Sequence, residues 1–342
     1  MKAVISNRIY MEVPIDLQLE IDKELTYMIA SHNPSDPPQV IKNMSIIRTG
    51  LISIPIGRTD LIPTNYEIID KRLMPKADFP DFKFPLRASQ QEVYDDLDDN
   101  CIVNAWVSWG KTFTGLAMAG KLGLKTLVIV HTVPLRNQWA KEVEKVYGFK
   151  AGIIGSGKFE IDSPIVIGNT QTLYRNIDKI KKEFGTIILD EMHHVSSPTF
   201  SKLLDSNYCR YKIGLSGTIQ RKDGKHVVFR DYFGSKVYKP PKENYMVPKV
   251  HLVQSEVRFM EYIHTVAMLA AAYAAKGHKV LVVSDRVQFL KVCAELAGEK
   301  AVCVTGDVPH EQREEIIDEI KHTSKNILFG TQSIFSEGIS VD

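Results

Sequence analysis

Gly110, Lys111 and Thr112 have the residue types and order that a phosphate-binding loop requires. They follow Ala105 after four residues, which is the phosphate-loop spacing with Ala in place of its first Gly. In such a loop the backbone N–H groups and the start of the next helix hold phosphates. The Lys reaches the β and γ oxygens, and the Thr hydroxyl binds Mg²⁺. The chemistry predicted for this stretch is therefore binding of ATP with Mg²⁺.

Asp190 and Glu191 come directly after Thr186 to Leu189, an apolar run typical of a fully buried parallel strand. In open α/β sheets, ligands bind at the C-terminal ends of the strands. We expect Asp190 to hold Mg²⁺ through water, and Glu191 to orient or deprotonate the attacking water. Lys111, Asp190 and Glu191 are thus the predicted catalytic residues, and Thr112 and Asp190 are the predicted metal ligands.

Two neighbouring patterns resemble a second phosphate-binding loop and a zinc site, but each lacks residues that such a site needs. Residues 152–159 repeat the glycine and lysine spacing, but Phe159 stands where a metal-binding hydroxyl is needed, and no helix-forming run follows. His193 and His194 resemble zinc ligands, yet no Cys-x-x-Cys or His-Glu-x-x-His spacing accompanies them. We expect instead that one of these histidines connects the nucleotide site to the next motif by hydrogen bonding.

The order of further motifs gives the chain a resemblance to a known family. Asp190-Glu191-Met192-His193 resembles the DExH box of superfamily 2 helicases, and its neighbours stand in that family's order. Arg221-Lys222-Asp223 resembles the RED element of the XPB-like branch, and the whole stretch is similar to phage recombination helicases of the UvsW kind. The resemblance covers about residues 86 to 342. It implies an ATP-dependent DNA helicase or translocase that remodels branched recombination or replication intermediates.

On the nucleotide side, the resemblance implies roles for several more residues. Arg87 and Gln90 lie in a stretch similar to the adenine-recognition motif, with Gln90 as the reader of the base. Ser89 replaces the usual Tyr of that motif. Glu337 and Gly338 resemble the end of motif V and are expected to lie at the nucleotide.

On the nucleic-acid side, His193, Ser216 and Thr218 are expected to couple hydrolysis to strand movement, with Gly217 in place of the usual Ala. Trp139 could stack on a base, although core packing is more typical of a Trp in this position. We expect the grip on DNA to consist mostly of phosphate contacts and to be sensitive to salt. The residues expected to contact the strand are Arg136, Thr170, Gln171, Thr172, Thr305 and Thr331.

The family pattern also contains a last motif, Gln-x-x-Gly-Arg-x-x-Arg, whose arginines touch the γ-phosphate. Such an arginine finger contributes about 10³-fold or more in rate. The chain ends at Asp342, before this motif, so we expect a shortened protein with weak ATPase activity. The connection from Gly217 to Val280 is brief for the family, which predicts missing residues near 257–261.

The elements that must position these residues predict an α/β fold. It consists of two tandem RecA-like parallel-sheet domains preceded by a small α+β N-terminal domain. Residues 1–78 form the accessory domain, for which a DNA-contacting role and a purely structural role both stay open. Residues 79–238 alternate strands and helices and form the ATP-binding domain, and residues 239–342 repeat the pattern but are incomplete at the C-terminus.

Proline-rich stretches set these boundaries, and local patterns predict the first elements. Met74 to Pro85 contains three prolines and mixed charges, which indicates a linker, and a second linker follows Lys239. Within the accessory domain we expect a strand at Arg8 to Val13 and a helix from Asp16 to Ala30.

Composition agrees with this interpretation without deciding it. The 342 residues are 44% hydrophobic and 25% charged, as in ordinary soluble proteins, and no run of about 18 apolar residues predicts a membrane span. The four cysteines are scattered and predict reduced thiols. These features predict a cytoplasmic protein that binds no membrane, in the host cytoplasm if this is a phage protein. The family resemblance further implies a monomer that binds single-stranded, forked or branched DNA.

The net charge of +2 is too small to indicate nucleic-acid binding by itself. Lys179, Lys181 and Lys182 share one predicted helix, and either a solvated face or a DNA contact fits them. Three other activities stay open at this point. They are a duplex translocase that never separates strands, a phosphate-loop kinase for a small molecule, and a catalytically inactive nucleic-acid clamp.

Overall fold

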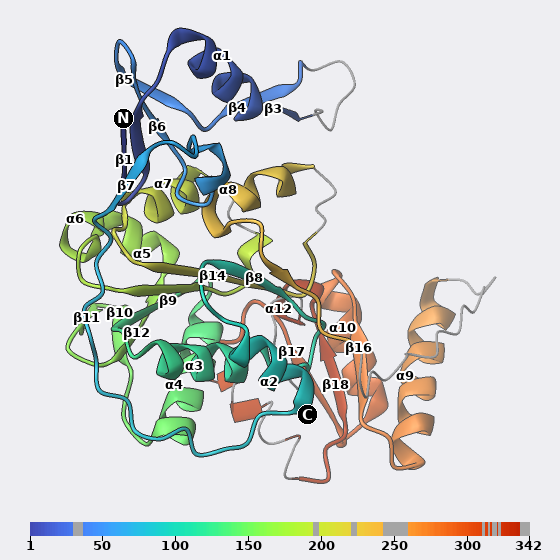
Figure 1. Cartoon of the computed structure of the whole chain (residues 1–342). Helices are drawn as coiled ribbons and strands as arrows, with labels where there is room; N and C mark the ends of the chain where they lie inside the picture. The colour runs from blue at the N-terminus through green and yellow to red at the C-terminus, as the bar shows by residue number, and fades with distance from the viewer. Residues whose placement is uncertain are drawn as a thin grey trace. The chain divides into compact units, whose positions relative to one another are not determined.

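The computed structural model describes residues 1–29, 37–193, 198–219, 224–241, 259–309, 312–313, 315–316, 320 and 323–335. The chain divides into two compact units, Met1–Tyr245 and Met246–Asp342. The first unit contains both the N-terminal domain and an α/β lobe, here called the first lobe (Figure 1). The predicted α/β class with parallel RecA-like sheets is confirmed.

The N-terminal domain is built around a five-stranded sheet in the order β5-β6-β2-β1-β7. Its strands are β1 (Lys2–Ile5), β2 (Ile9–Glu12), β5 (Ser45–Arg48), β6 (Leu51–Ile54) and β7 (Glu67–Asp70). Helix α1 (Ile15–Glu24) is shorter than predicted. Thr26–Ile29 forms strand β3, which pairs with β4 (Gln39–Lys42), because this β-branched and aromatic run favours a strand over a helix.

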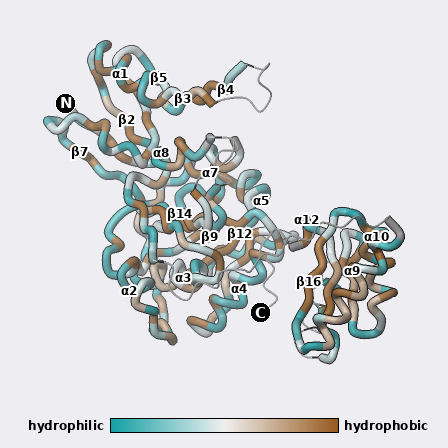
Figure 2. The backbone as a smooth tube through the Cα atoms, turned by 90° about the vertical axis from the view of Figure 1, so that its right-hand side faces the viewer, coloured by the Kyte–Doolittle hydropathy of each residue, from teal (hydrophilic) through white to brown (hydrophobic). Residues whose placement is uncertain are grey.

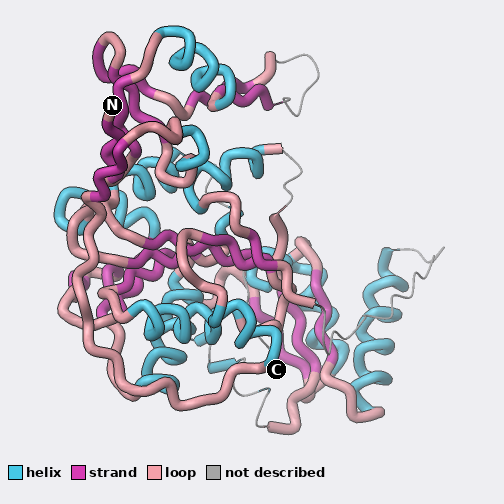
Figure 3. Tube along the Cα trace, viewed as in Figure 1, coloured by secondary structure: helices cyan, strands magenta, loops and turns pink. Residues whose placement is uncertain are grey.

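The first lobe contains an eight-stranded sheet in the order β11-β10-β12-β9-β13-β14-β8-β15. Its strands are β8 (Cys101–Asn104), β9 (Thr126–Val130), β10 (Gly152–Gly155), β11 (Lys158–Phe159), β12 (Ile165–Asn169), β13 (Thr186–Leu189), β14 (Tyr211–Ser216) and β15 (Val237–Tyr238). All pairs are parallel except β10 with β11. The strands form one layer with helices on both sides, and apolar stretches run along them (Figures 2 and 3).

Two apolar cores hold the helices to the two faces of this sheet. The helices are α2 (Ala88–Asp95), α3 (Lys111–Leu122), α4 (Val133–Tyr147), α5 (Thr170–Arg175), α6 (Ile177–Ile180), α7 (Pro198–Ser206) and α8 (Phe229–Phe233). Leu116 of α3 and Trp139 of α4 belong to one core, whereas Leu173 of α5 and Leu203 of α7 belong to the other. Helices α3 and α4 therefore cover one face, and α5 and α7 cover the opposite face.

The stretch predicted as a linker, 74–85, is packed against the first lobe. Lys76 forms an isolated bridge with Leu124. The rings of Phe79 and Phe82 contact the ring of Tyr147 at centroid distances of 5.5 and 5.7 Å. Residues 74–85 therefore form a strap along the first lobe, and the aromatic side chains fix it there.

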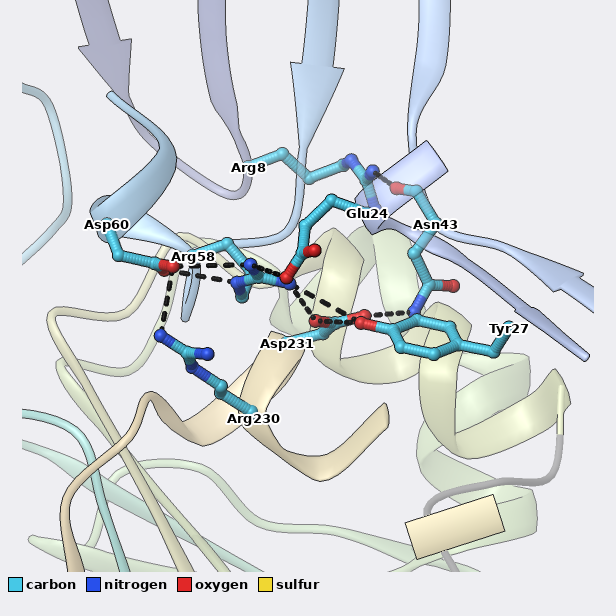
Figure 4. A network of polar contacts seen from close by, with 8 residues as sticks. All are labelled: Arg8, Glu24, Tyr27, Asn43, Arg58, Asp60, Arg230 and Asp231. Carbon is cyan, nitrogen blue, oxygen red and sulfur yellow. Dashed lines mark hydrogen bonds and ion pairs between the residues drawn. The ribbon is translucent and has the colours of Figure 1, made fainter. Parts of the chain in front are cut away.

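A polar network joins the N-terminal domain to helix α8 of the first lobe (Figure 4). Asp231 is fully buried; its carboxylate accepts hydrogen bonds from Tyr27 Oη at 2.9 Å and Asn43 Nδ2 at 2.5 Å. The guanidinium of Arg58 is 3.5 Å from the same carboxylate. Gly57 N–H donates to the Asp231 carbonyl at 2.8 Å, so backbone and side chains both contribute to the joint.

The second unit has a three-stranded parallel sheet in the order β16-β18-β17. Its described elements are α9 (Phe259–Ala275), β16 (Val280–Val283), α10 (Val287–Ala297), β17 (Ala301–Val304), β18 (Ile327–Gly330) and α12 (Gln332–Phe335). All four cysteines of the chain are free thiols, as predicted. Among the described residues, the helices are too short or too polar to cross a membrane.

Candidate active site

The predicted phosphate loop connects β8 to α3, and Gly110 is the residue that its geometry requires. Gly110 has a φ of +90° and precedes the first residue of α3. A Cβ atom there would lie 2.8 Å from Gln90 Nε2, so a side chain would be both strained and crowded. Lys111 Nζ turns back over the loop and donates to the Ala105 carbonyl at 3.2 Å. Ala at position 105 thus leaves the loop and the lysine contact intact.

Gln90 and Arg87 hold this loop from the side of helix α2. Gln90 Nε2 donates to the Trp109 carbonyl at 2.9 Å, and Gln90 Oε1 accepts from Arg87 N at 3.0 Å. The guanidinium of Arg87 also donates to the Trp109 carbonyl. Ser89 Oγ accepts from Trp109 Nε1 at 3.1 Å, so the residue that replaces the usual Tyr binds the loop. The importance of Trp109 had no signal in the sequence pattern.

Asp190 is 6% exposed and lies at the end of β13, where the sequence predicts it. Its Oδ2 accepts from Trp139 Nε1 at 2.8 Å, and its Oδ1 accepts from Glu191 N at 2.9 Å. Burial raises the pKa of Asp190, while the Trp139 hydrogen bond and the Lys111 charge act in the opposite direction. Trp139 is itself fully buried, so it packs in the core and orients this carboxylate.

Glu191 has a φ of +49°, a left-handed conformation that is unusual for a residue with a side chain. Burial opposes its ionisation, but the contact with His193 and the Lys111 charge outweigh burial and hold the pKa of Glu191 below its usual value. The positive charge of Lys111 therefore favours the ionised form of both carboxylates. The loop lysine and the acidic pair share one site at the C-terminal edge of the sheet.

His193 lies between this site and the end of β14. Its Nδ1 atom is 3.3 Å from Glu191 Oε2 and 3.3 Å from Ser216 Oγ. Ser216 Oγ in turn donates to the Thr218 carbonyl at 2.8 Å and accepts from Thr218 N at 3.2 Å. These contacts form a short polar path from the acidic pair to Thr218. His194 and Arg221 lie outside the described residues.

Gly217, in the middle of this motif, lies against the phosphate loop. A Cβ atom at Gly217 would be 3.6 Å from Lys111 Nζ and 3.7 Å from the Ala105 carbonyl, both ordinary contact distances. The Ala that is usual at this position would therefore fit, because the space between the motif and the phosphate loop accommodates a methyl group.

The donor set fits a nucleoside triphosphate with Mg²⁺. It offers backbone N–H groups at a helix start, the Lys111 ammonium, the Thr112 hydroxyl and two carboxylates. Within the described ranges, no group of three His, Cys, Asp or Glu side chains could hold a metal by itself. Mg²⁺ does not need such a cluster, because it usually binds only one or two protein side chains and completes its coordination with waters and phosphate oxygens.

Two residues predicted to contact a DNA strand are turned into the protein. Arg136 is 6% exposed and donates to Asn169 Oδ1 at 3.0 Å and to Ser156 Oγ at 3.1 Å. Thr170 is 5% exposed and donates to the Val130 carbonyl at 3.1 Å. In this structure the two side chains fix the ends of β9 and β12, and a contact of either one with DNA stays a prediction. Gln171, next in sequence, is exposed, and Thr172 is half-buried.

The stretch 152–159, rejected above as a nucleotide site, is a β-hairpin. Strands β10 and β11 pair in antiparallel fashion, with Gly155 opposite Lys158. The two turn residues, Ser156 and Gly157, have φ values of 50° and 81°, the pattern of a type I′ turn. The turn also presents Ser156 to Arg136.

In the second unit, Thr305 and Thr331 follow the neighbouring strands β17 and β18, whose ends pair at Val304 and Gly330. Both side chains are buried. They therefore lie at one edge of that sheet. Glu337 and Gly338 lie outside the described residues.

Two family models match the chain. Residues 83–221 match the family described as "Type III restriction enzyme, res subunit", and residues 261–342 match "Helicase conserved C-terminal domain". "Probable helicase D10" of Escherichia phage T5 is 39% identical over 100% of this chain and 81% of its own length. "ATP-dependent DNA helicase uvsW" of Enterobacteria phage T4 is 26% identical over 64% of this chain and 51% of its own length.

More distant similarities agree with these matches. "DNA 3'-5' translocase XPB2" of Sulfurisphaera tokodaii is 26% identical over 54% of this chain and 44% of its own length, so this chain spans less than half of that relative. Among solved structures, T4 UvsW has a TM-score of 0.53 at 19% identity, covering 100% of this chain and 82% of that chain. At this identity the structural likeness shows the fold alone. On the evidence of the matched helicase domains and the phage T5 relative, the chain belongs to the superfamily 2 family of ATP-dependent DNA helicases and translocases.

Proposed function

We propose that the chain uses the hydrolysis of ATP, with Mg²⁺, to move along DNA and remodel branched recombination or replication intermediates. The observation that supports this most directly is the site at the C-terminal edge of the sheet, where the charge of Lys111 favours the ionised form of both Asp190 and Glu191. The phage T5 and T4 relatives, both named as helicases, support movement on nucleic acid. They also favour action in the cytoplasm of an infected host cell, and we propose that the chain acts there as a monomer.

The site residues divide the chemistry among them. The bound nucleotide supplies the bond that is cleaved, and Mg²⁺ neutralises charge on the phosphates. Lys111 and the loop N–H groups would hold the phosphates, while Thr112 and Asp190 would hold Mg²⁺. Glu191, whose pKa lies below its usual value, is ionised at neutral pH and can accept a proton from the attacking water.

His193 gives this chemistry a route to the nucleic acid. Its contacts with Glu191 and Ser216 connect the site of hydrolysis to the Ser216-Gly217-Thr218 motif. Because His193 contacts both residues, a change in the protonation or position of Glu191 alters the contact between His193 and Ser216. We propose that this path, together with the strand-contacting residues Gln171 and Thr172, couples turnover to movement.

The test is ATP turnover with no DNA and with single-stranded, duplex and forked DNA. We expect stimulation by DNA, and Lys111→Ala should reduce turnover by at least about 10³-fold because phosphate positioning is lost. A circular dichroism spectrum like that of the unchanged protein would show that Lys111→Ala folds. Turnover that does not respond to any DNA would instead support a phosphate-loop kinase and reject the proposal.

A second candidate is a translocase that moves on duplex DNA without separating its strands. The relative named as a 3'-5' translocase favours it. Displacement of a triplex-forming strand without unwinding of a fork would identify this activity. Unwinding of a fork would identify a helicase.

A further inference from the structure

A group of cationic side chains lies away from the nucleotide site, on helices α5, α6 and α7 and on the two residues that follow α6. Residues 174–182 together with Lys202 contain five cations and one carboxylate, Asp178. The whole chain has a net charge of only +2, so this local excess is not a general property of the surface. The cations are Arg175, Lys179, Lys181, Lys182 and Lys202.

A surface pocket of about 350 Å³ lies among these helices, here called the α5–α7 pocket. Arg175, Lys181 and Lys202 line it, together with the aromatic side chains of Tyr174 and Tyr208. The N-terminal domain supplies one wall through Asn7, whose Nδ2 donates to the Asp205 carbonyl of α7 at 2.7 Å. The pocket is therefore built across the joint between the N-terminal domain and the first lobe.

Contacts within the protein hold two of the cations that line the pocket, Lys202 and Lys181. Lys202 Nζ lies over the Tyr174 ring at 5.4 Å, which ties α7 to α5. Lys181 shares its charge with Asp178 at 2.7 Å. Within the described residues, no ion pair neutralises Arg175 or Lys202, so these two side chains present the positive charge of the pocket.

The pocket continues the surface that begins at Gln171. Gln171 and Arg175 both belong to α5, a helix of six residues. At about 1.5 Å per residue this helix spans about 9 Å, or roughly two to three nucleotide steps of about 3.4 Å. A strand that passes Gln171 can therefore reach Arg175 without a break. Tyr174, which is 37% exposed, offers a ring face beside the cations.

We propose that the α5–α7 pocket binds the phosphodiester backbone of DNA. This contact is separate from the helicase motifs, and the first lobe and the N-terminal domain both contribute to it. The proposal rests on the proposed function, because it extends the path of the same DNA. It gives the N-terminal domain a part in DNA binding through the placement of Asn7. Arg175 and Lys202 supply the charge, and Tyr174 supplies a stacking surface.

The test is the salt dependence of binding to forked DNA, measured by fluorescence anisotropy without ATP. Arg175→Ala combined with Lys202→Ala removes two cations. Each lost phosphate contact lowers the slope of log K against log salt by about 0.9, so the double variant should lose about 2 units of slope. Arg175→Lys combined with Lys202→Arg keeps both charges and should retain the slope.

The matched control is Lys141→Ala combined with Lys145→Ala. These exposed lysines lie on α4, on the opposite face of the sheet, and the control makes the same change in net charge. We expect its slope to equal that of the unchanged protein. Equal slopes for the control and the Arg175/Lys202 double variant would overturn the proposal, provided that both unfold thermally as cooperatively as the unchanged protein.

Inorganic phosphate separates DNA from a small anion as the ligand. If phosphate raises the unfolding temperature of the unchanged protein but not of the Arg175/Lys202 variant, and the DNA slopes are equal, the pocket binds free anions and the proposal is wrong. Because DNA binding is measured without ATP, failure here is distinct from failure of the proposed function. That function fails if DNA does not stimulate turnover.

Discussion

Trp139 Nε1 donates a hydrogen bond to Asp190 Oδ2 over 2.8 Å. The bond connects helix α4, which also contains the predicted strand contact Arg136, to the carboxylate expected to hold Mg²⁺. Burial raises the pKa of Asp190, and the Trp139 hydrogen bond acts against this effect and also orients the carboxylate. Trp139 therefore has a role in the chemistry of the site although its ring lies in the core.

Trp139→Phe should raise the Mg²⁺ concentration needed for ATP turnover by about 10- to 100-fold, as expected for loss of a group that orients a metal ligand. The measurement is turnover against Mg²⁺ concentration. Tyr147→Phe is the control, because Tyr147 donates a buried hydrogen bond to the Leu116 carbonyl in the same core. The control should lose about 1 kcal/mol of stability and keep its Mg²⁺ requirement. If both variants need equally more Mg²⁺, the Trp139 bond has no specific role.

Two glycines of the site should respond in opposite ways to Ala. Gly217→Ala places a methyl group at ordinary contact distances and should raise the free energy of unfolding by about 0.4–1 kcal/mol while preserving turnover. Gly110→Ala forces a side chain into a φ of +90° beside Gln90, which costs about 1–3 kcal/mol, and should abolish ATP binding. Urea unfolding and nucleotide titration measure both effects. Loss of ATP binding in Gly217→Ala would contradict the packing of this motif against the loop.

His193→Ala and Ser216→Ala should not have additive effects. If the imidazole carries the signal from Glu191 to Ser216, removal of either end breaks the same path. The ratio of turnover with and without DNA should then be equally low in both single variants and in the double variant. The expected coupling energy is about 0.5–3 kcal/mol. Strictly additive losses would mean that the two residues act independently.

Tyr27→Phe should change the pH dependence of stability. Burial and the neighbouring Asp231 carboxylate raise the pKa of Tyr27 above its usual value, although Arg58 acts in the opposite direction. As pH rises above about 10, the unfolded chain loses this proton while the folded chain keeps it, so the free energy of unfolding falls. The variant lacks the proton and loses a hydrogen bond to a charged group, which contributes about 1.5–3 kcal/mol at neutral pH.

The stability difference between the unchanged protein and Tyr27→Phe should therefore narrow as pH rises above about 10. Urea unfolding at several pH values between neutral and alkaline conditions measures it. The other tyrosines are present in both proteins and cancel in the difference. A difference that stays constant with pH would show that Tyr27 keeps no extra proton in the folded protein.

Local sequence patterns predicted the parts of the site that depend on neighbouring residues. The run Thr186 to Leu189 is β-branched and mostly apolar, and the structure gives it as strand β13 with these bounds. Gly110, Lys111 and Thr112 stand at the start of a helix as their spacing predicts. In each case one short stretch contains both the element and the residue that it positions.

Features that depend on contacts between distant segments could not be predicted from the sequence. The family resemblance predicts that Arg136 contacts the DNA strand, whereas in the structure its guanidinium donates hydrogen bonds to Asn169 and Ser156. Asn169 is the last residue of β12 and Ser156 lies in the turn between β10 and β11, so no local pattern around Arg136 predicts these partners. The helix predicted to reach Ala30 ends early because Thr26 to Ile29 find a pairing partner in β4. The contacts of Trp109, through which α2 holds the phosphate loop, likewise come from outside the loop's own stretch of sequence.

The strap formed by residues 74–85 has a practical consequence for anyone who wants to isolate the ATPase lobe. A fragment that begins at Leu86 would leave Tyr147 and Phe113 without the rings of Phe79 and Phe82 that cover them. Bare aromatic surface of this kind promotes precipitation. A fragment of this lobe should therefore start at Met74 or earlier, so that it keeps the strap and the aromatic contacts that the strap makes.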